Sequence, residues 1–538
     1  MRKPLQRVGS FFYRQVTQIQ KGGLLVFFRK SAKLWKLLCL NLLATWAVFL
    51  KIDWVEAYYF VGFRLIRKYK RNLLQPHFSK KSINRMKKLE NKAIFCLEKY
   101  ISHKPDLAEL MKWAEANRLV CELFYVKDNY EKYINVCQRV AKVRRDIAKE
   151  HHLEDLNIEF IPRSIVPGSI GPYEYIAVYV QAGLLGLRSP KKLILLLDPE
   201  SSVTNPCFLN YWRKYVTIIT DPALIQLLSP LEKCLTVPLL LLMPFYQRSM
   251  ITHRTLGMVR ERWVSEKRPP VLALSNEDYE RGWQYLKLLG VPEGAWFVCL
   301  HAREAGWHDG GQSYSERFRN TDINTYLLAI KAIVNAGGWV IRIGDPSMTP
   351  LPEMDHVIDY ARSPMKTDWM DVFLCAQCRF FIGTSSGMFV LVMAFGVPLV
   401  MTNLLAGQVV FFFSSKDLFI SRTCWSKKEN RALSFSELIS PPIGMFALQF
   451  YYEKSGLEVI ENTPEEIRDV VQEMLARFDK SLTYTEEDEN LQGRFKDMIK
   501  TCSESYGDEK VLVNARIGRD FLRKHIALLP AEEVCVKV

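Results

Sequence analysis

One stretch of this chain constrains the fold more than any other. This stretch, Phe380–Val400, begins with an apolar triplet and a cluster of small residues. It continues with an apolar run of helix length and ends with a second apolar triplet. This order predicts a strand, a tight loop, a helix and a strand, which is a βαβ unit. The loop Gly383–Gly387 offers backbone N–H groups and hydroxyls at the start of the helix, which suits a diphosphate. The alternative is a turn that binds nothing, and the loop alone does not decide between them.

The chain before and after Pro269-Pro270 carries the same alternation of short apolar strands with helices. Such alternation predicts parallel sheets with helices on their faces. We therefore expect an α/β fold of two Rossmann-like domains, over residues 156–268 and 269–480, that face each other across a cleft. The predicted strands are Asn157–Ile161, Lys192–Leu197, Val216–Thr220, Val271–Leu274, Ala295–Leu300, Trp339–Ile343, His356–Tyr360 and the two of the βαβ unit.

The positive charge of the chain is concentrated at its N-terminus. Residues 1–81 hold 17 of the 73 lysines and arginines but only two of the 58 acids, so they account for the whole net charge of +15. A neutral remainder excludes a uniformly basic nucleic-acid binder. The longest uncharged run, Leu37–Leu50, is too short to cross a bilayer, which takes about 20 residues. Cations interleaved with aromatic residues favour a peripheral region on an anionic membrane, although helices that pack on the enzyme body are the alternative.

Two further regions complete the predicted domain organisation. Residues 82–155 have apolar residues at helical spacing and are expected to be helical. In the second α/β domain, the predicted helices include Asp322–Ala336 and Asp368–Gln377. Residues 481–538 are expected to form a helical tail. The twelve cysteines are scattered without a disulfide framework, which favours a reducing, cytosolic compartment.

Charged residues collect where the second domain's strands are expected to end. His301, Arg303 and Glu304 follow the strand Ala295–Leu300, while Arg317 and Arg319 lie in a long polar stretch before Thr321, which we expect to cap the next helix. An arginine that forks to phosphate beside a glycine loop can neutralise a leaving diphosphate. The sequence shows no Asp-x-Asp pair, so we expect neither a metal nor another cofactor.

The other expected site residues come from three places in the sequence. The loop after the strand contributes Gly383, Thr384, Ser385, Ser386 and Gly387, and the strand and turn before it contribute Arg342 and Asp345. With Arg317 and Arg319, these residues are expected to bind the substrate that carries the diphosphate, which is the donor of a group to a second substrate, the acceptor. On the first domain, a small-residue loop contributes Gly168, Ser169 and Gly171, followed by Glu174, on the acceptor side. The residues do not single out a general base among Glu304, Asp345 and Glu174.

Five segments of the chain are distinctive, namely His301–Glu304, Phe318–Tyr326, Trp339–Ser347, Asp368–Gly387 and Asn462–Glu466. Together they resemble a family of bacterial glycosyltransferases that is associated with surface polysaccharide gene clusters. The His-x-Arg strand end is also distantly similar to that of GDP-fucose-dependent fucosyltransferases, and the loop at Gly383 to that of heptosyltransferases. The resemblance implies the two-domain fold called GT-B, metal-independent transfer, and a diphosphate held by His301 and Arg303.

The sequence and the resemblance together predict an inverting glycosyltransferase. We expect it to move a hexosyl or deoxyhexosyl group from a nucleotide sugar to a glycan or lipid-linked glycan, at the cytoplasmic face of the membrane. One alternative is a sugar-nucleotide epimerase or hydrolase of the same fold. The other is a membrane-bound scaffold without enzymatic activity.

Overall fold

The computed structural model describes residues 55–73, 80–103, 105, 110, 112–113, 116–117, 119–120, 130–166, 169–236, 242–245, 248–304, 314–405, 413–440, 442–446, 449–504 and 513–530. The chain divides into two compact units. The first comprises residues 1–72 and 78–104, and the second comprises residues 73–77 and 105–538. The uncharged run Leu37–Leu50, part of the predicted membrane-associating region, lies outside the described residues.

The first unit contains a pair of helices, α3 (Val55–Leu73) and α4 (Lys80–Ile101). Gly62 lets the two helices approach closely, because a Cβ atom at this position would lie 2.8 Å from the side chain of Leu97. The rings of Tyr59 and Tyr100 also meet, with their centroids 5.0 Å apart. Small and aromatic residues on facing stripes therefore explain why these two segments pair.

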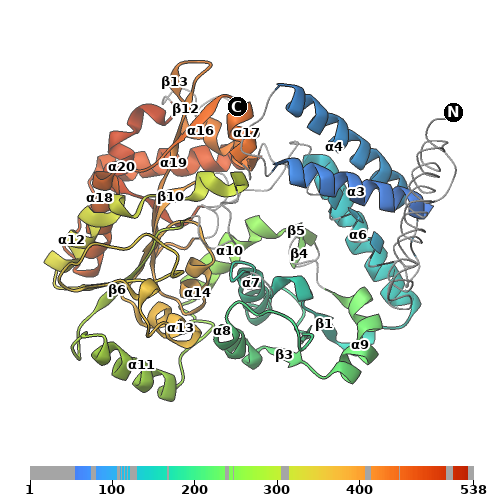
Figure 1. Ribbon diagram of the computed structural model, residues 1–538, viewed down its shortest axis with the longest axis horizontal. Helices are drawn as coiled ribbons and strands as arrows, with labels where there is room; N and C mark the ends of the chain where they lie inside the picture. The colour runs from blue at the N-terminus through green and yellow to red at the C-terminus, as the bar shows by residue number, and fades with distance from the viewer. Residues whose placement is uncertain are drawn as a thin grey trace, which may run out of the picture. The chain divides into compact units, whose positions relative to one another are not determined.

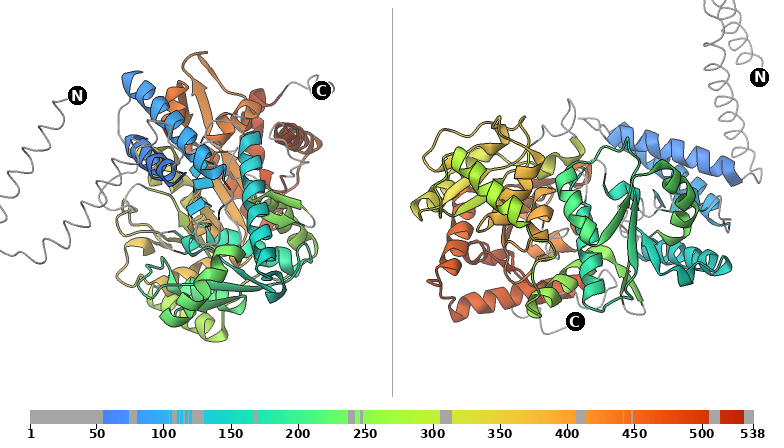
Figure 2. Two further views of the ribbon diagram at one scale, coloured as in Figure 1. Left: turned by 90° about the vertical axis from the view of Figure 1, so that its right-hand side faces the viewer. Right: turned by 90° about the horizontal axis from the view of Figure 1, so that it is seen from below.

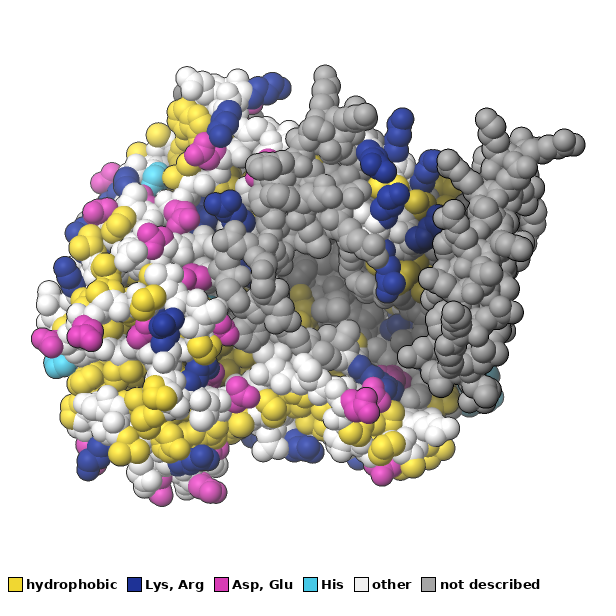
Figure 3. Space-filling model, in the orientation of Figure 1, with side chains coloured by type: hydrophobic (Ala, Val, Ile, Leu, Met, Phe, Trp, Pro, Cys, Tyr) yellow, Lys and Arg dark blue, Asp and Glu magenta, His cyan; other side chains and the backbone are white. Residues whose placement is uncertain are grey.

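The outer faces of α3 and α4 carry exposed cations, which appear in dark blue in Figure 3. Arg64, Arg67 and Lys68 of α3 are exposed, as are Lys88 and Lys92 of α4. Among the helices that the structure describes, each is too short or too polar to span a bilayer.

In the second unit, α6 (Tyr130–Glu150) precedes a small parallel sheet. The sheet has the order β1-β2-β3, and its strands are β1 (Ile158–Phe160), β2 (Lys192–Leu196) and β3 (Val216–Ile219). Its apolar residues pack with Ile225 of α9 to form a core. Figure 2 shows these strands in teal and green. The helices of this part are α7 (Tyr173–Leu184), α8 (Pro206–Tyr211), α9 (Pro222–Leu235) and α10 (Thr252–Ser265).

Among the described residues that follow α10 in the second unit, a seven-stranded parallel sheet forms the core. Its order is β15-β11-β10-β9-β6-β7-β8. Central strands that are buried throughout, such as β6, explain the near-continuous apolar runs in the sequence. The strands are β6 (Phe297–His301), β7 (Trp339–Arg342), β8 (Val357–Ile358), β9 (Phe381–Gly383), β10 (Leu399–Leu404), β11 (Leu418–Ser421) and β15 (Arg516–Ile517).

Helices cover both faces of this sheet (Figure 1). α12 and α18 pack against each other on one face, and α13 and α14 lie together on the other. The prediction of an α/β fold with parallel sheets is thus confirmed. The helices are α11 (Asn276–Leu288), α12 (Leu327–Asn335), α13 (Asp368–Gln377), α14 (Met388–Ala394), α16 (Phe435–Ile439), α17 (Gln449–Lys454), α18 (Pro464–Phe478), α19 (Glu486–Glu504) and α20 (Arg519–Lys524).

Two local predictions are wrong. Val271–Leu274 is not a strand, because the segment runs beside α14 and makes one backbone hydrogen bond there, from Leu272 N–H to the carbonyl of Ala394, instead of a ladder. The helical segment after residue 321 is capped by Asp322 and not by Thr321. The hydroxyl of Thr321 instead donates to Glu461, 2.8 Å away.

Two small antiparallel sheets complete the second unit. One has the order β13-β12-β14, and the other is the hairpin β4-β5. The strands are β4 (Leu242–Phe245), β5 (Arg248–Ile251), β12 (Thr423–Ser426), β13 (Arg431–Ala432) and β14 (Leu457–Ile460).

A buried amide pair locks the end of β10 to the start of α18. The backbone N–H of Asn403 donates to Oδ1 of Asn462 over 2.6 Å, and the N–H of Asn462 donates to Oδ1 of Asn403 over 2.8 Å. The side chain of Asn462 also donates to the carbonyl of Ser421. Each buried polar atom in this group therefore depends on the others for its partner.

We expect Asn462→Ala to lower the free energy of unfolding by about 2–3 kcal/mol, because it leaves the buried N–H of Asn403 without its acceptor. Urea unfolding at fixed protein concentration would measure the loss. Asn335→Ala, at an exposed position near the end of α12, is the matched control and should change stability by less than about 0.5 kcal/mol. Equal stability of the two variants would contradict the role of the amide pair.

Candidate functional site

The candidate site lies where the larger sheet changes its direction of winding. From β6 the chain moves outward to β7 and β8, and then returns to place β9 on the other side of β6. His301, the last residue of β6, stands opposite Gly383, the last residue of β9. Open parallel sheets bind ligands in the crevice at such a switch point. The two motifs that the sequence analysis singled out therefore share one edge of the sheet.

Gly383 permits the close approach of these two strands. A Cβ atom at Gly383 would lie 2.6 Å from the backbone oxygen of His301. The next residue, Thr384, donates its backbone N–H to the same oxygen over 3.2 Å. Its hydroxyl accepts from the N–H of Arg303 over 3.0 Å. Thr384 therefore fixes the backbone of Arg303, and its hydroxyl oxygen already accepts one hydrogen bond.

His301 is buried and uncharged near neutral pH. Its Nδ1 lies 3.1 Å from the carbonyl oxygen of Ile343. Because a carbonyl can only accept, Nδ1 carries the hydrogen and Nε2 is left as an acceptor. Burial lowers the pKa of His301 to about 4. The ring is thus held in one orientation and is a weak base.

Two arginines stand beside the glycine loop. The side chain of Arg303 donates to Oδ1 of Asn320, and Nη2 of Arg319 donates to the carbonyl of Ser385 over 2.8 Å. Arg319 belongs to the 3-10 helix Tyr314–Arg319, so this turn is tied to the loop after β9. Both guanidinium groups therefore lie at the same rim as His301.

The glycine loop also meets the small-residue loop of the first α/β part. A Cβ atom at Gly387 would lie 3.1 Å from the backbone nitrogen of Gly171 and 3.2 Å from Cβ of Ile170. The structure thus brings together two loops that are far apart in the sequence. Gly168 lies outside the described residues.

A cavity of about 460 Å³ opens between these two loops and the ends of β6 and β7. Its volume falls in the usual range for small-molecule sites, which is roughly 300–1,000 Å³. Cations from the rim of the sheet and carboxylates from the start of α13 share its wall. The charged residues in the lining are Arg303, Glu304, Arg319, Asp345, Lys366, Asp368 and Asp371, and His301, Ser169, Ser386 and Gly387 also line it.

Glu304 and Arg342 form a structural pair. Arg342 is fully buried, and its Nη2 lies 2.6 Å from Oε1 of Glu304. The other oxygen of Glu304 accepts from both the N–H and the hydroxyl of Thr349. The predicted donor-binding residue Arg342 is not part of the cavity wall, and both oxygens of Glu304 are already occupied.

Several other predicted site residues lie away from the cavity wall. Glu174 is buried beside Arg260, at 3.6 Å, and burial raises its pKa to about 7. Arg317 is exposed on the turn that carries Arg319. Gly171, Gly383, Thr384 and Ser385 support the two loops without lining the cavity.

The sequence analysis missed the contribution of α13 and of the residues before α8. Asn205 caps α8 and donates its side-chain amide to the carbonyl of Asp368 over 2.9 Å. This bond ties the first α/β part to the start of α13, beside the cavity. Asp371 could have been noticed in the sequence, because it is an acid among the buried apolar residues of an amphipathic helix.

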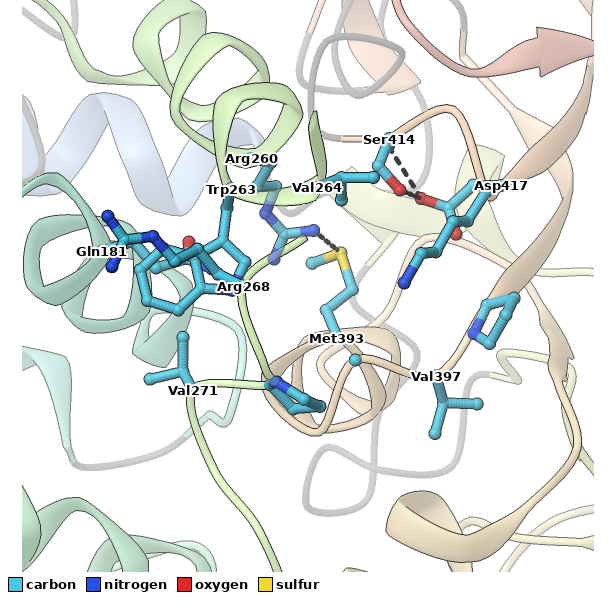
Figure 4. Close-up of a pocket in the computed structure, with 14 residues that line it drawn as sticks. Gln181, Arg260, Trp263, Val264, Arg268, Val271, Met393, Val397, Ser414 and Asp417 are labelled. Atoms are coloured by element: carbon cyan, nitrogen blue, oxygen red, sulfur yellow. Dashed lines mark hydrogen bonds between the residues drawn. The ribbon is translucent and has the colours of Figure 1, made fainter. Parts of the chain in front are cut away.

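A second cavity lies beside Pro270 and is much smaller, at about 70 Å³. Figure 4 shows Arg260 pointing toward the sulfur of Met393 there, with Asp417 held by Ser414. A space of this size holds a few waters and no sugar nucleotide. Among the described residues, His, Cys, Asp and Glu side chains form no group of three or more suited to a metal ion.

Comparison with known proteins gives likenesses of structure only. No protein-family model matches the sequence, and no curated protein matches it. The structure of the glycosyl transferase family 9 protein from Veillonella parvula DSM 2008 is 8% identical over 49% of this chain and 85% of its own, with a TM-score of 0.32.

Two E. coli structures are similarly distant. ADP-heptose lps heptosyltransferase II is 13% identical over 49% of this chain and 90% of its own, with a TM-score of 0.28. The dodecameric, iron-containing glycosyltransferase TibC from enterotoxigenic E. coli H10407 is 15% identical over 45% of this chain, with a TM-score of 0.26, and the match spans 57% of TibC. Structural likeness at these TM-scores does not identify the function of this protein.

Proposed function

We propose that this protein is a glycosyltransferase of GT-B architecture that uses a nucleotide-diphosphate sugar as its donor. The observation that carries the proposal is the 460 Å³ cavity at the switch point between β6 and β9, with Arg303 and Arg319 on its rim. Guanidinium groups that are fixed in place before the reaction can stabilise the charge that develops on a leaving diphosphate. The carboxylates at the start of α13 supply acceptors for sugar hydroxyls on another part of the wall.

In this proposal, the two α/β parts divide the substrates between them. The nucleotide sugar occupies the side formed by Arg303, Ser386 and Gly387, and the acceptor enters from the side of Ser169 and Ile170. Two observations support this arrangement. Gly387 approaches Gly171 closely, and residues of both loops line the same cavity. The acceptor is a glycan or a lipid-linked glycan of a surface polysaccharide.

The test is a thermal-shift screen of the full chain against GDP-, UDP-, ADP-, TDP- and CMP-sugars, followed by product analysis with the sugar that binds. Stabilisation by one nucleotide family at concentrations above its Kd is expected. Release of free sugar, or of an epimer, at full rate without acceptor would favour the hydrolase or epimerase alternative. If no nucleotide raises the unfolding temperature, the proposal is wrong and the scaffold alternative gains.

We also propose that residues 1–81 hold the protein at an anionic membrane surface, and exposed cations on α3 support this. Replacing Arg64, Arg67 and Lys68 with glutamine is expected to weaken binding to phosphatidylglycerol vesicles roughly 100-fold, since each cation near such a surface contributes about 1 kcal/mol. Vesicle co-sedimentation measures the change. A control variant with three exposed lysines of the second unit replaced should bind as the wild type does; these are Lys287, Lys331 and Lys428. Equal losses in both variants would contradict a specific surface on α3.

A further inference from the structure

Asp371 has an unusual position in the cavity wall. It lies in the first turns of α13, which begins after the cap residue Thr367, and only 7% of its surface is exposed. Its Oδ2 pairs with Nζ of Lys366 at 2.5 Å. Its Oδ1 is buried and has no hydrogen-bond partner among the described residues. A buried carboxylate oxygen without a donor costs free energy unless a ligand supplies one.

The other carboxylates of the wall differ from Asp371. Both oxygens of Glu304 are occupied by Arg342 and Thr349. Asp345 accepts from the backbone N–H of Ser347 in its own turn and is only partly buried. Asp368 is exposed at the first residue of α13. Only Asp371, among the described acids of the lining, combines burial with a carboxylate oxygen that has no hydrogen-bond partner.

We propose that Asp371 is the catalytic base that takes the proton from the attacking hydroxyl of the acceptor. This inference rests on the proposed function. As the acceptor oxygen forms its bond to the anomeric carbon, the bond from that carbon to the diphosphate breaks. The bonding electron pair leaves with the diphosphate beside Arg303, and the hydroxyl proton moves to the carboxylate of Asp371.

The electrostatic surroundings of Asp371 suit this role. Burial raises the pKa of Asp371 to about 6, while Lys366 acts to lower it. A carboxylate with this pKa is ionised at pH 7 and is a better proton acceptor than an unperturbed one. The charged and titratable groups that act on Asp371 or feel its charge are Lys366, Asp368, Tyr360, Cys299 and Cys375.

His301 is the competing base in the same cavity. Its pKa of about 4 makes its ring a weaker proton acceptor than the carboxylate of Asp371. The bond from Nδ1 to Ile343 also holds the ring in place as an orienting group. The two side chains therefore predict different pH profiles. A base at Asp371 loses activity as pH falls through about 6, whereas a base at His301 keeps it down to about 4.

The test uses the full chain and the donor found by thermal shift. Release of the nucleoside diphosphate is followed with water as the acceptor, because water needs the same base. Asp371→Asn is expected to slow release at least about 100-fold while the Kd for the donor changes less than about twofold. Asp355→Asn, an exposed acid outside the cavity, is the control and should act as the wild type does.

A second variant separates catalysis from a structural role. Lys366→Met removes the cation that lowers the pKa of Asp371, so the acid limb of kcat/KM is expected to move to higher pH. This readout keeps the proposal testable even if Asp371→Asn fails to fold. An unchanged limb, or undiminished release by folded Asp371→Asn, would overturn the role of Asp371 alone. A wild-type protein that neither binds nor cleaves any nucleotide sugar would overturn the proposed function, and this inference with it.

Discussion

Replacing Arg303 with alanine is expected to lower kcat/KM for sugar transfer roughly a thousandfold, the largest effect of any single side chain in the cavity. The reason is that a guanidinium fixed beside the leaving diphosphate stabilises charge that is absent from the ground state. Its backbone is anchored by Thr384 and its side chain by Asn320, so the group is oriented before the substrate arrives. Isothermal titration with the nucleoside diphosphate, together with initial rates, would measure both binding and transfer.

Two further variants make this test specific. Arg303→Lys keeps the charge but loses the forked geometry, so its activity should fall between wild type and Arg303→Ala. Arg317→Ala removes an exposed arginine outside the cavity, so it should change kcat/KM less than about twofold. Undiminished diphosphate binding by a folded Arg303→Ala would show that the diphosphate lies elsewhere.

The second large effect is expected from Gly383→Ala. The added methyl group would lie 2.6 Å from the backbone oxygen of His301 and 2.7 Å from the ring of Phe381. A backbone atom in the middle of a parallel sheet has little room to move, so we expect a loss of about 3 kcal/mol, at the upper end of the usual range for overpacking. If the predicted domain 269–480 unfolds as one unit, the midpoint of thermal unfolding should fall by roughly 6–12 °C. Differential scanning fluorimetry would measure it.

Gly493→Ala is the matched control for this variant. Gly493 lies in α19, and a Cβ atom there would meet no atom within 4 Å. Alanine is favoured over glycine inside a helix by up to about 1 kcal/mol, so this variant should be slightly more stable than the wild type. If Gly383→Ala were equally well tolerated, β6 and β9 would have to be less tightly paired than the structure shows.

Local sequence patterns predict much of the larger sheet because its strands are buried on both faces. The strands Phe381–Gly383 and Leu399–Leu404 each appear in the sequence as a run of apolar residues followed by small or polar residues. The helix α13 has the predicted bounds, Asp368–Gln377. By contrast, Val271–Leu274 is as apolar as a strand but has no neighbouring strand with which to form a ladder. Whether an extended apolar segment becomes a strand depends on a partner that local pattern does not reveal.

The candidate site is less predictable, because a charged residue looks the same in sequence whether it is engaged or open. Arg303 and Arg342 each stand at the end of an apolar strand. The first lines the cavity, and the second is buried against Glu304. Asp371 carried no motif, and its importance depends on a missing partner at one oxygen atom. Motifs therefore located the rim of the site, whereas the roles of individual side chains depend on their three-dimensional partners.

The edge strand β15 has a consequence for how the chain is made. Its residues Arg516 and Ile517 pair with Leu418 and Phe419 of β11, with α16, α17, α18 and α19 between them in the sequence. At a translation rate of about 5–20 residues per second, β11 leaves the ribosome roughly 5–20 s before its outer partner. Until then it presents an open strand edge, which can pair with another chain. The nascent protein therefore keeps this edge uncovered until late in its synthesis, and a chaperone bound to it during that interval would prevent association.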